Sequence, residues 1–138
     1  MGLGSGGRVR LLRMDSGRVL RACNSFGDNL EVLKKVFPLK PSGYFGEKGE
    51  GRGHTRNIFS DDPAGTALVF AGIATLNYRT ATVIEGKGLA YTMRDGTVVT
   101  HRYYSSSKDK SPVVELNVHN VSGVRSQKIH FVKSKKGA

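Results

Sequence analysis

The sequence predicts an α+β fold, in which two N-terminal helices pack on one face of a twisted antiparallel sheet of four to five strands. Residues 28–76 carry apolar side chains at spacings of three and four, which is typical of helices. Residues 77–133 alternate with period two and contain tight-turn signals, which is typical of hairpin-linked strands. With 138 residues, the chain has the length of a single domain, and residues 1–27 form a basic arm of linker-like composition.

The first helix is predicted to begin at Asp28 or Asn29, either of which can cap it, and to run to about Phe37. Leu30, Leu33 and Phe37 fall on one face of this helix. Two prolines follow closely, and because proline does not continue a helix, we expect the helix to end there.

A glycine-rich loop (residues 41–53) and a short extended or irregular segment (residues 53–63) are predicted before the second helix. Three side chains can cap this helix: Ser60, Asp61 and Asp62. Pro63 suits the first turn because its missing N–H would have no partner there. We expect the helix to run to about Leu76.

Five strands are predicted after the second helix, at residues 79–85, 89–94, 97–104, 112–120 and 127–132. Residues 86–88 form one tight turn, and Asp95 followed by Gly96 is a strong hairpin signal for the next. Because the helices cover one face of this sheet, the other face stays open to a ligand.

The chain is strongly basic, with 22 Lys and Arg against 11 Asp and Glu and a formal net charge of +11 at pH 7. Such an excess attracts polyanions, so nucleic acid is the leading class of partner, with an anionic membrane surface or an acidic protein as alternatives. The longest weakly polar run, residues 64–76, is too short to span a bilayer. Residues 1–7 do not resemble a signal peptide. We expect that this chain does not anchor itself in a membrane.

Polar side chains on the predicted strands suit the binding of phosphate. In the fourth strand, alternate residues from Val114 to Val118 are apolar, so Glu115 points away from the helices. By the same alternation, Lys128 and His130 of the last strand point outward. The third strand carries Thr-His-Arg-Tyr-Tyr before three serines, and either of its faces could be the buried one. Lys, Arg, His, Thr and Ser on one face supply charge-assisted donors around an anion.

No metal or other cofactor is expected. The chain has one cysteine, and its four histidines lack the spacing of a metal motif. The carboxylates are spread along the chain, and the adjacent pair Asp61 and Asp62 is explained by helix capping. RNA can be cleaved without metal by a base for the 2′-hydroxyl, an acid for the 5′-oxygen and cations around the phosphate.

Three segments carry a resemblance to a known family. They are Thr-Arg-x-Ile-x-Ser-x-Asp-Pro-x-x-Thr-Ala at residues 55–67, Thr-His-Arg-x-x-Ser-Ser-Ser-x-x-x-Ser-Pro-x-Val-Glu-Leu-x-Val at residues 100–118, and Gln-Lys-Ile-His-Phe at residues 127–131. Together they resemble the C-terminal toxin domains of polymorphic toxins, including contact-dependent growth-inhibition effectors of the CdiA type. The resemblance extends over residues 50–133, and the family more often has Tyr at the position of His101 and Asp at that of Glu115.

The resemblance implies an antibacterial ribonuclease toxin that cleaves tRNA, with a fold of the barnase, EndoU, colicin or RelE type. It also implies secretion or cell-surface delivery as part of a larger effector, followed by action in the cytoplasm of the target bacterium. A cognate immunity protein would neutralise the toxin, and some such toxins require elongation factor Tu. The positions that match the motif are Arg56, Thr100, Arg102, Ser105, Ser106, Ser107 and Ser111.

The chemistry and the resemblance together give the candidate site. The candidate catalytic residues are His54, Arg56, Thr100, Arg102 and Ser106. The candidate substrate-binding residues are His101, Tyr104, Ser105, Ser107, Ser111, Glu115, Lys128 and His130. Two alternative functions stay open: a metal-dependent DNase toxin, which EDTA would inhibit, and a non-enzymatic basic module, which would bind RNA in a salt-sensitive manner and leave it intact.

Overall fold

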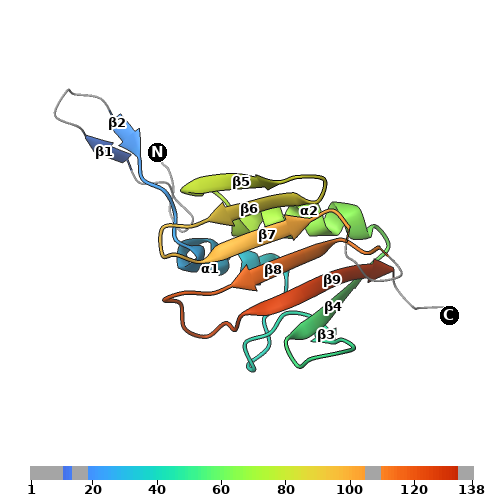
Figure 1. Cartoon of the computed structure of the whole chain (residues 1–138). Helices are drawn as coiled ribbons and strands as arrows, with labels where there is room; N and C mark the ends of the chain where they lie inside the picture. Colours follow the sequence, from blue (N-terminus) through green and yellow to red (C-terminus); the bar gives the residue numbers. More distant parts are fainter. Residues whose placement is uncertain (1–10, 14–18, 105–109, 134–138) are drawn as a thin grey trace.

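The computed structural model describes residues 11–13, 19–104 and 110–133 (Figure 1). Its main element is a seven-stranded mixed sheet with the order β3-β4-β9-β8-β7-β6-β5. The strands are β3 (Glu47–Lys48), β4 (Thr55–Ser60), β5 (Thr80–Ile84), β6 (Gly88–Thr92), β7 (Val98–Arg102), β8 (Val113–Asn117) and β9 (Gln127–Lys133). β4 and β9 are parallel, whereas the other neighbouring pairs are antiparallel.

Within the described residues, two helices accompany the sheet: α1 (Phe26–Val36) and α2 (Pro63–Ala74). α2 contacts β4, β7, β8 and β9, and α1 packs on α2, so both helices lie behind the sheet in Figure 1. In the N-terminal arm, β1 (Leu11–Arg13) and β2 (Val19–Arg21) form a separate antiparallel hairpin. Neither described helix combines the length and apolar character that crossing a bilayer demands.

The predicted architecture was wrong in its sheet. We expected four to five antiparallel strands, all after residue 77, but the sheet has seven strands and one parallel pair. Of the two additional strands, β3 lies in the predicted loop, and β4 lies in the segment that was predicted to be extended or irregular. β4 is held as a strand by parallel pairing with β9, and a contact between segments so distant in sequence leaves no local turn signal.

α1 begins one turn earlier than the predicted caps. Ser25 is its N-cap: the Ser25 Oγ accepts the Asp28 N–H at 2.9 Å, and the Asp28 carboxylate accepts the Ser25 N–H at 3.0 Å. This reciprocal pair is a capping box. Asp28 therefore acts from inside the first turn, and Asn29, the other predicted cap, is buried.

The N-cap of α2 is Asp62, whose Oδ1 accepts the Gly65 N–H at 3.1 Å. The helix ends at Ala74, before the predicted Leu76. Asn29 of α1 fixes this end, because its Nδ2 donates to the carbonyls of Ala74 and Leu76 at 2.9 and 3.0 Å. The bond to Ala74 satisfies a carbonyl group that the end of the helix leaves without a partner, and the bond to Leu76 ties the chain that follows.

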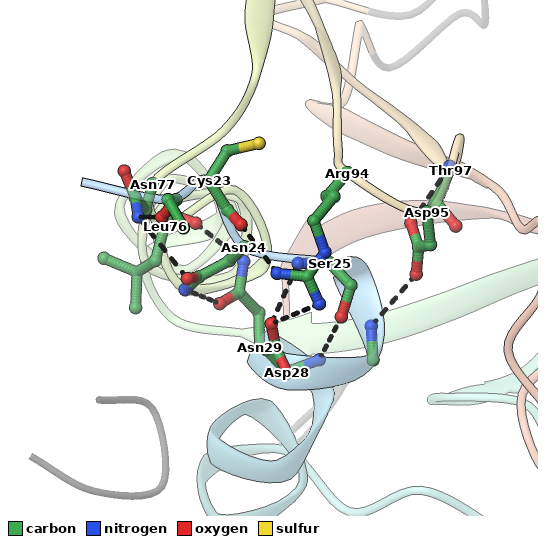
Figure 2. Close-up of polar contacts among 12 residues, drawn as sticks. Cys23, Asn24, Ser25, Asp28, Asn29, Leu76, Asn77, Arg94, Asp95 and Thr97 are labelled. Carbon is green, nitrogen blue, oxygen red and sulfur yellow. Dashed lines mark hydrogen bonds and ion pairs between the residues drawn. The ribbon is translucent and has the colours of Figure 1, made fainter. Parts of the chain in front are cut away.

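Figure 2 shows the polar network that extends from Asn29. Asn24 donates from Nδ2 to Oδ1 of Asn29 at 2.8 Å. Arg94, in the connection between β6 and β7, donates from Nη1 to the Cys23 carbonyl at 2.8 Å, and its Nη2 lies 3.4 Å from the Asp28 carboxylate. The network therefore joins the start of α1, the end of α2 and the β6–β7 connection.

The core lies between α2 and the sheet. The Phe70 ring of α2 makes edge-to-face contacts with three other rings, at centroid distances of 5.0 Å to Phe37, 5.1 Å to Phe45 and 5.6 Å to Phe131. The strands add further buried apolar side chains to this cluster: Val99, Val114, Leu116 and Ile129. The alternate residues of the same strands point to the opposite side of the sheet, which we call the open face.

Candidate nucleic-acid interface

The open face brings polar side chains of three central strands together. Thr100 and Arg102 come from β7, Glu115 comes from β8, and Lys128 and His130 come from β9. The residues that alternate with them along the strands, such as His101, Val114 and Ile129, are buried on the side of the sheet that the helices cover. Successive side chains of a strand point to opposite faces, so the polar residues point to the open face. Five of the predicted site residues thus share one surface.

A depression of about 540 Å³ lies on this face. The strand register places Glu115 between Thr100 and Lys128, and all three line the depression. His54 and Asn117 line it as well. His54 is exposed immediately before β4, and its carbonyl accepts the Lys128 N–H at 2.9 Å. A carboxylate, an ammonium, an imidazole and a hydroxyl therefore border one space.

Thr100, Glu115 and Lys128 form one row of side chains across the three strands, and a second row lies next to it. Val113 is buried between Arg102 and His130 in the strand register. The Arg102 Nη2 lies 3.6 Å from Oε1 of Glu115, which links the two rows. The Oγ of Ser111 and the Nδ1 of His130 form a hydrogen bond of 3.0 Å. Because a partly exposed ion pair adds little stability, the main effect of the Arg102–Glu115 contact is to hold a cation beside the carboxylate.

Arg56 does not join this cluster. It pairs with Ile129 in the register of β4 and β9, so it points to the face that the helices cover. Its side chain is buried, with 9% of the residue exposed, and its Nη2 donates to the Gly46 carbonyl at 3.1 Å. The guanidinium lies over the Tyr44 ring, 4.6 Å from the centroid. These contacts give Arg56 a role in the structure, and we no longer place it in the candidate site.

His101 also lies on the helix-covered face, on the opposite side of β7 from Thr100. It is only 6% exposed, and its ring packs edge-to-face against Tyr103 with 5.1 Å between centroids. Burial lowers the pKa of His101, because desolvation disfavours the charged imidazolium. We therefore remove His101 from the predicted substrate-binding residues.

The lowered pKa of His101 predicts that acid destabilises the fold. Below the ordinary histidine pKa of about 6.5, the unfolded chain binds a proton that the folded chain does not, so the free energy of unfolding falls as pH falls. His101→Gln should remove this contribution. Urea unfolding at about pH 7.5 and about pH 5, on either side of the ordinary histidine pKa, should show a smaller loss for the variant than for the wild type. Equal losses would contradict the prediction.

Comparisons with known proteins add nothing to this geometry. No protein-family model, curated protein or solved structure matches this chain. Among the described residues, no group of three or more His, Cys, Asp or Glu side chains could hold a metal ion. The chemistry of the open face is therefore the basis for assigning a function.

Part of the predicted site lies outside the described residues, namely Ser105, Ser106 and Ser107. Tyr104, which precedes them after the end of β7, is exposed. Ser111, which follows them, is buried and contacts His130 as described above.

Two open-face residues of β4 were missing from the predicted site. Thr55 is the cross-strand neighbour of Lys128, and Asn57 is the cross-strand neighbour of His130. The exposed Phe59 follows them on the same face. Polar and apolar residues do not alternate cleanly in this strand, because Arg56 lies on the helix-covered face and Phe59 on the open face. The sequence pattern therefore gave no signal for the side on which Thr55 and Asn57 lie.

Proposed function

We propose that this protein is an endoribonuclease that cleaves RNA without a metal ion, using groups of the open face. The observation that carries the proposal is the depression bordered by Glu115, Lys128 and His54, with Arg102 3.6 Å from the Glu115 carboxylate. A general base, a general acid and cations are the groups that such a reaction requires. The net charge of +11 adds long-range attraction for a polyanion.

In the proposed reaction, Glu115 is the general base. It takes the proton of a ribose 2′-hydroxyl, and the 2′-oxygen attacks the adjacent phosphorus. The bond from phosphorus to the 5′-oxygen breaks, and protonated His54 donates its proton to that leaving oxygen. The products are one strand ending in a 2′,3′-cyclic phosphate and one beginning with a 5′-hydroxyl. Exchange with water then removes the proton from Glu115 and returns one to His54.

The spacing of the strands supports these roles. β8, β9 and β4 are consecutive in the sheet, and neighbouring strands are about 4.8 Å apart, so about 10 Å separates the backbones of β8 and β4. Lys128 lies on the strand between them. Glu115 and His54 can therefore approach a phosphate above Lys128 from opposite sides, as an in-line displacement requires. Lys128 and Arg102 stabilise the negative charge that develops on the phosphate.

The remaining open-face groups suit substrate binding. Thr100 and Asn117 border the same depression and can donate hydrogen bonds to phosphate or ribose oxygens. Asn57 and His130, in the second row, extend the polar surface along the direction of the strands. Phe59 offers an exposed ring for stacking by an unpaired base.

The decisive experiment is cleavage of a single-stranded RNA by the purified full chain in the presence of excess EDTA. We expect cleavage to persist, and to stop when the ribose at the cut site is replaced by 2′-deoxyribose. The new 3′ ends should carry cyclic phosphate. Loss of activity in EDTA together with cleavage of DNA would favour the metal-dependent DNase, whereas intact RNA with salt-sensitive binding would favour the non-enzymatic module.

The role of His54 can be tested separately. His54→Gln should slow RNA cleavage by about 10²-fold or more, since the variant cannot protonate the leaving oxygen. His119→Gln is the matched control, because His119 is also an exposed loop histidine but does not line the depression. Cleavage rates on one RNA should separate the two variants. Equal activity of His54→Gln and the wild type would exclude His54 as the acid.

We further propose a biological setting in which the chain is an antibacterial toxin domain. It would be delivered as part of a larger secreted or cell-surface effector and would cleave tRNA in the cytoplasm of the target bacterium. A cognate immunity protein would neutralise it, and elongation factor Tu is a candidate activating factor. The support is the resemblance of residues 55–67, 100–118 and 127–131 to polymorphic toxin domains. Sequencing of RNA ends after expression in bacteria would identify the RNA that is cut.

A further inference from the structure

The outer strand β5 is an edge without the usual protection against pairing. It is the last strand of the seven-stranded sheet, and four of its five residues are exposed. Its sequence, Thr-Ala-Thr-Val-Ile, contains no charge, proline or glycine. The opposite edge, β3, has only two residues, Glu47 and Lys48, and both are charged. Short or charged edges resist pairing with another chain, whereas a longer uncharged edge is a template for it.

The apolar side of β5 is also exposed. Ala81 and Val83 point to the side of the sheet on which the helices lie, because they are in register with Tyr91 and Leu89 of β6. The contacts of α2 with the sheet are to β4, β7, β8 and β9, away from this edge. Val83 is accordingly 73% exposed. A partner strand on β5 would therefore gain both backbone hydrogen bonds and an apolar contact.

The residues around β5 are complementary to a second copy of themselves. In an antiparallel pair with a two-fold axis beside Thr82, Ala81 lies opposite Val83 of the partner subunit. Arg79 then lies opposite Glu85 of the partner subunit, and the symmetry repeats both contacts. The backbone of Arg79 is still tied to β6, since its N–H donates to the Thr92 carbonyl at 2.9 Å. A parallel arrangement would place like charges opposite each other.

From these observations we infer that the chain forms a two-fold symmetric dimer through antiparallel pairing of β5 with β5 of a second copy. The axis is perpendicular to the sheet, so the two open faces lie on the same side and form one continuous surface. Exposed ion pairs add little affinity, so the Arg79–Glu85 contacts mainly select the antiparallel register. The inference is independent of the proposed nuclease activity.

Charge reversal tests the register. The mass of the full chain, measured by light scattering over a series of concentrations, should rise from monomer to dimer. Arg79→Glu and Glu85→Arg should each weaken the dimer roughly tenfold or more, because like charges then meet at both ends of the strand pair. The double variant should return to within about twofold of the wild type, because the opposite charges are restored.

A cysteine cross-link tests the position of the axis. Thr82→Cys in a Cys23→Ser background should form an intermolecular disulfide on oxidation, because the two positions adjoin the axis. Thr80→Cys in the same background is the matched control: Thr80 is also exposed and on the same face, but it lies opposite Ile84 of the partner subunit. Preferential cross-linking at Thr82 would support the dimer. A monomeric mass at every concentration, equal cross-linking of both variants, or no recovery in the charge-swapped double variant would overturn it.

Discussion

Glu115→Gln should lower the rate of RNA cleavage by about 10²–10⁴-fold, the range that a positioned general base contributes. The amide keeps the size of the side chain and its place between Thr100 and Lys128, but it does not accept the 2′-hydroxyl proton. The variant also removes a negative charge from the open face, so RNA binding should not weaken. Cleavage rates and binding constants measured on the same RNA distinguish a catalytic loss from a binding loss.

Glu31→Gln is the control for the change in charge. Glu31 is an exposed residue of α1, away from the open face, and its Oε2 lies 3.3 Å from the Nζ of Lys34. This variant should cleave RNA at the wild-type rate. If Glu115→Gln kept the wild-type rate, or if both variants lost activity equally, Glu115 would not be the base.

Phe70→Ala is the substitution with the largest expected effect on stability, at about 3–5 kcal/mol in the free energy of unfolding. Phe70 is completely buried, and its ring contacts those of Phe37, Phe45 and Phe131. Removing it leaves a cavity between α2 and the sheet that these rings cannot fill completely. Because domains are stable by about 5–15 kcal/mol, the loss is a large fraction of the total. Urea unfolding followed by circular dichroism measures it.

Leu68→Ala is the matched control on the same helix. Leu68 is 63% exposed, so its truncation should change the free energy of unfolding by no more than about 0.5 kcal/mol. Both variants introduce alanine, the best helix former, into α2, so neither loses stability through a lower helix propensity. A Phe70→Ala effect as small as that of Leu68→Ala would mean that the aromatic cluster does not hold α2 on the sheet.

Local sequence patterns located most of the individual elements. The capping residues before Pro63 and the apolar spacing after it predicted α2 because a helix is formed by contacts within a few residues. The Asp95–Gly96 turn predicted the connection between β6 and β7 for the same reason. The segment that became β4 lacked such signals, because its strand partner is β9.

In the candidate site, too, local patterns predicted some residues, whereas pairing between distant strands decided others. Alternation within β8 and β9 was enough to predict that Glu115, Lys128 and His130 point away from the core. For β4, the side on which each residue points is set by its pairing with β9. The pairing puts Arg56 on the helix-covered face, against the Tyr44 ring, and Thr55 on the open face. Sequence reasoning therefore selected Arg56 for its chemistry and missed Thr55 and Asn57.

By itself, the sequence determined the strong positive charge, the cap of α2, the hairpin turns and the sidedness of strands with a clear apolar row. These properties depend on composition or on neighbours a few residues apart. Only the tertiary structure decided the seven-strand order, the parallel β4–β9 pair and the meeting of His54 with Glu115 and Lys128 at one depression. Those features arise from pairing between strands that are far apart in the chain. The register of such a pair decides which side chains of the two strands lie on the same face of the sheet.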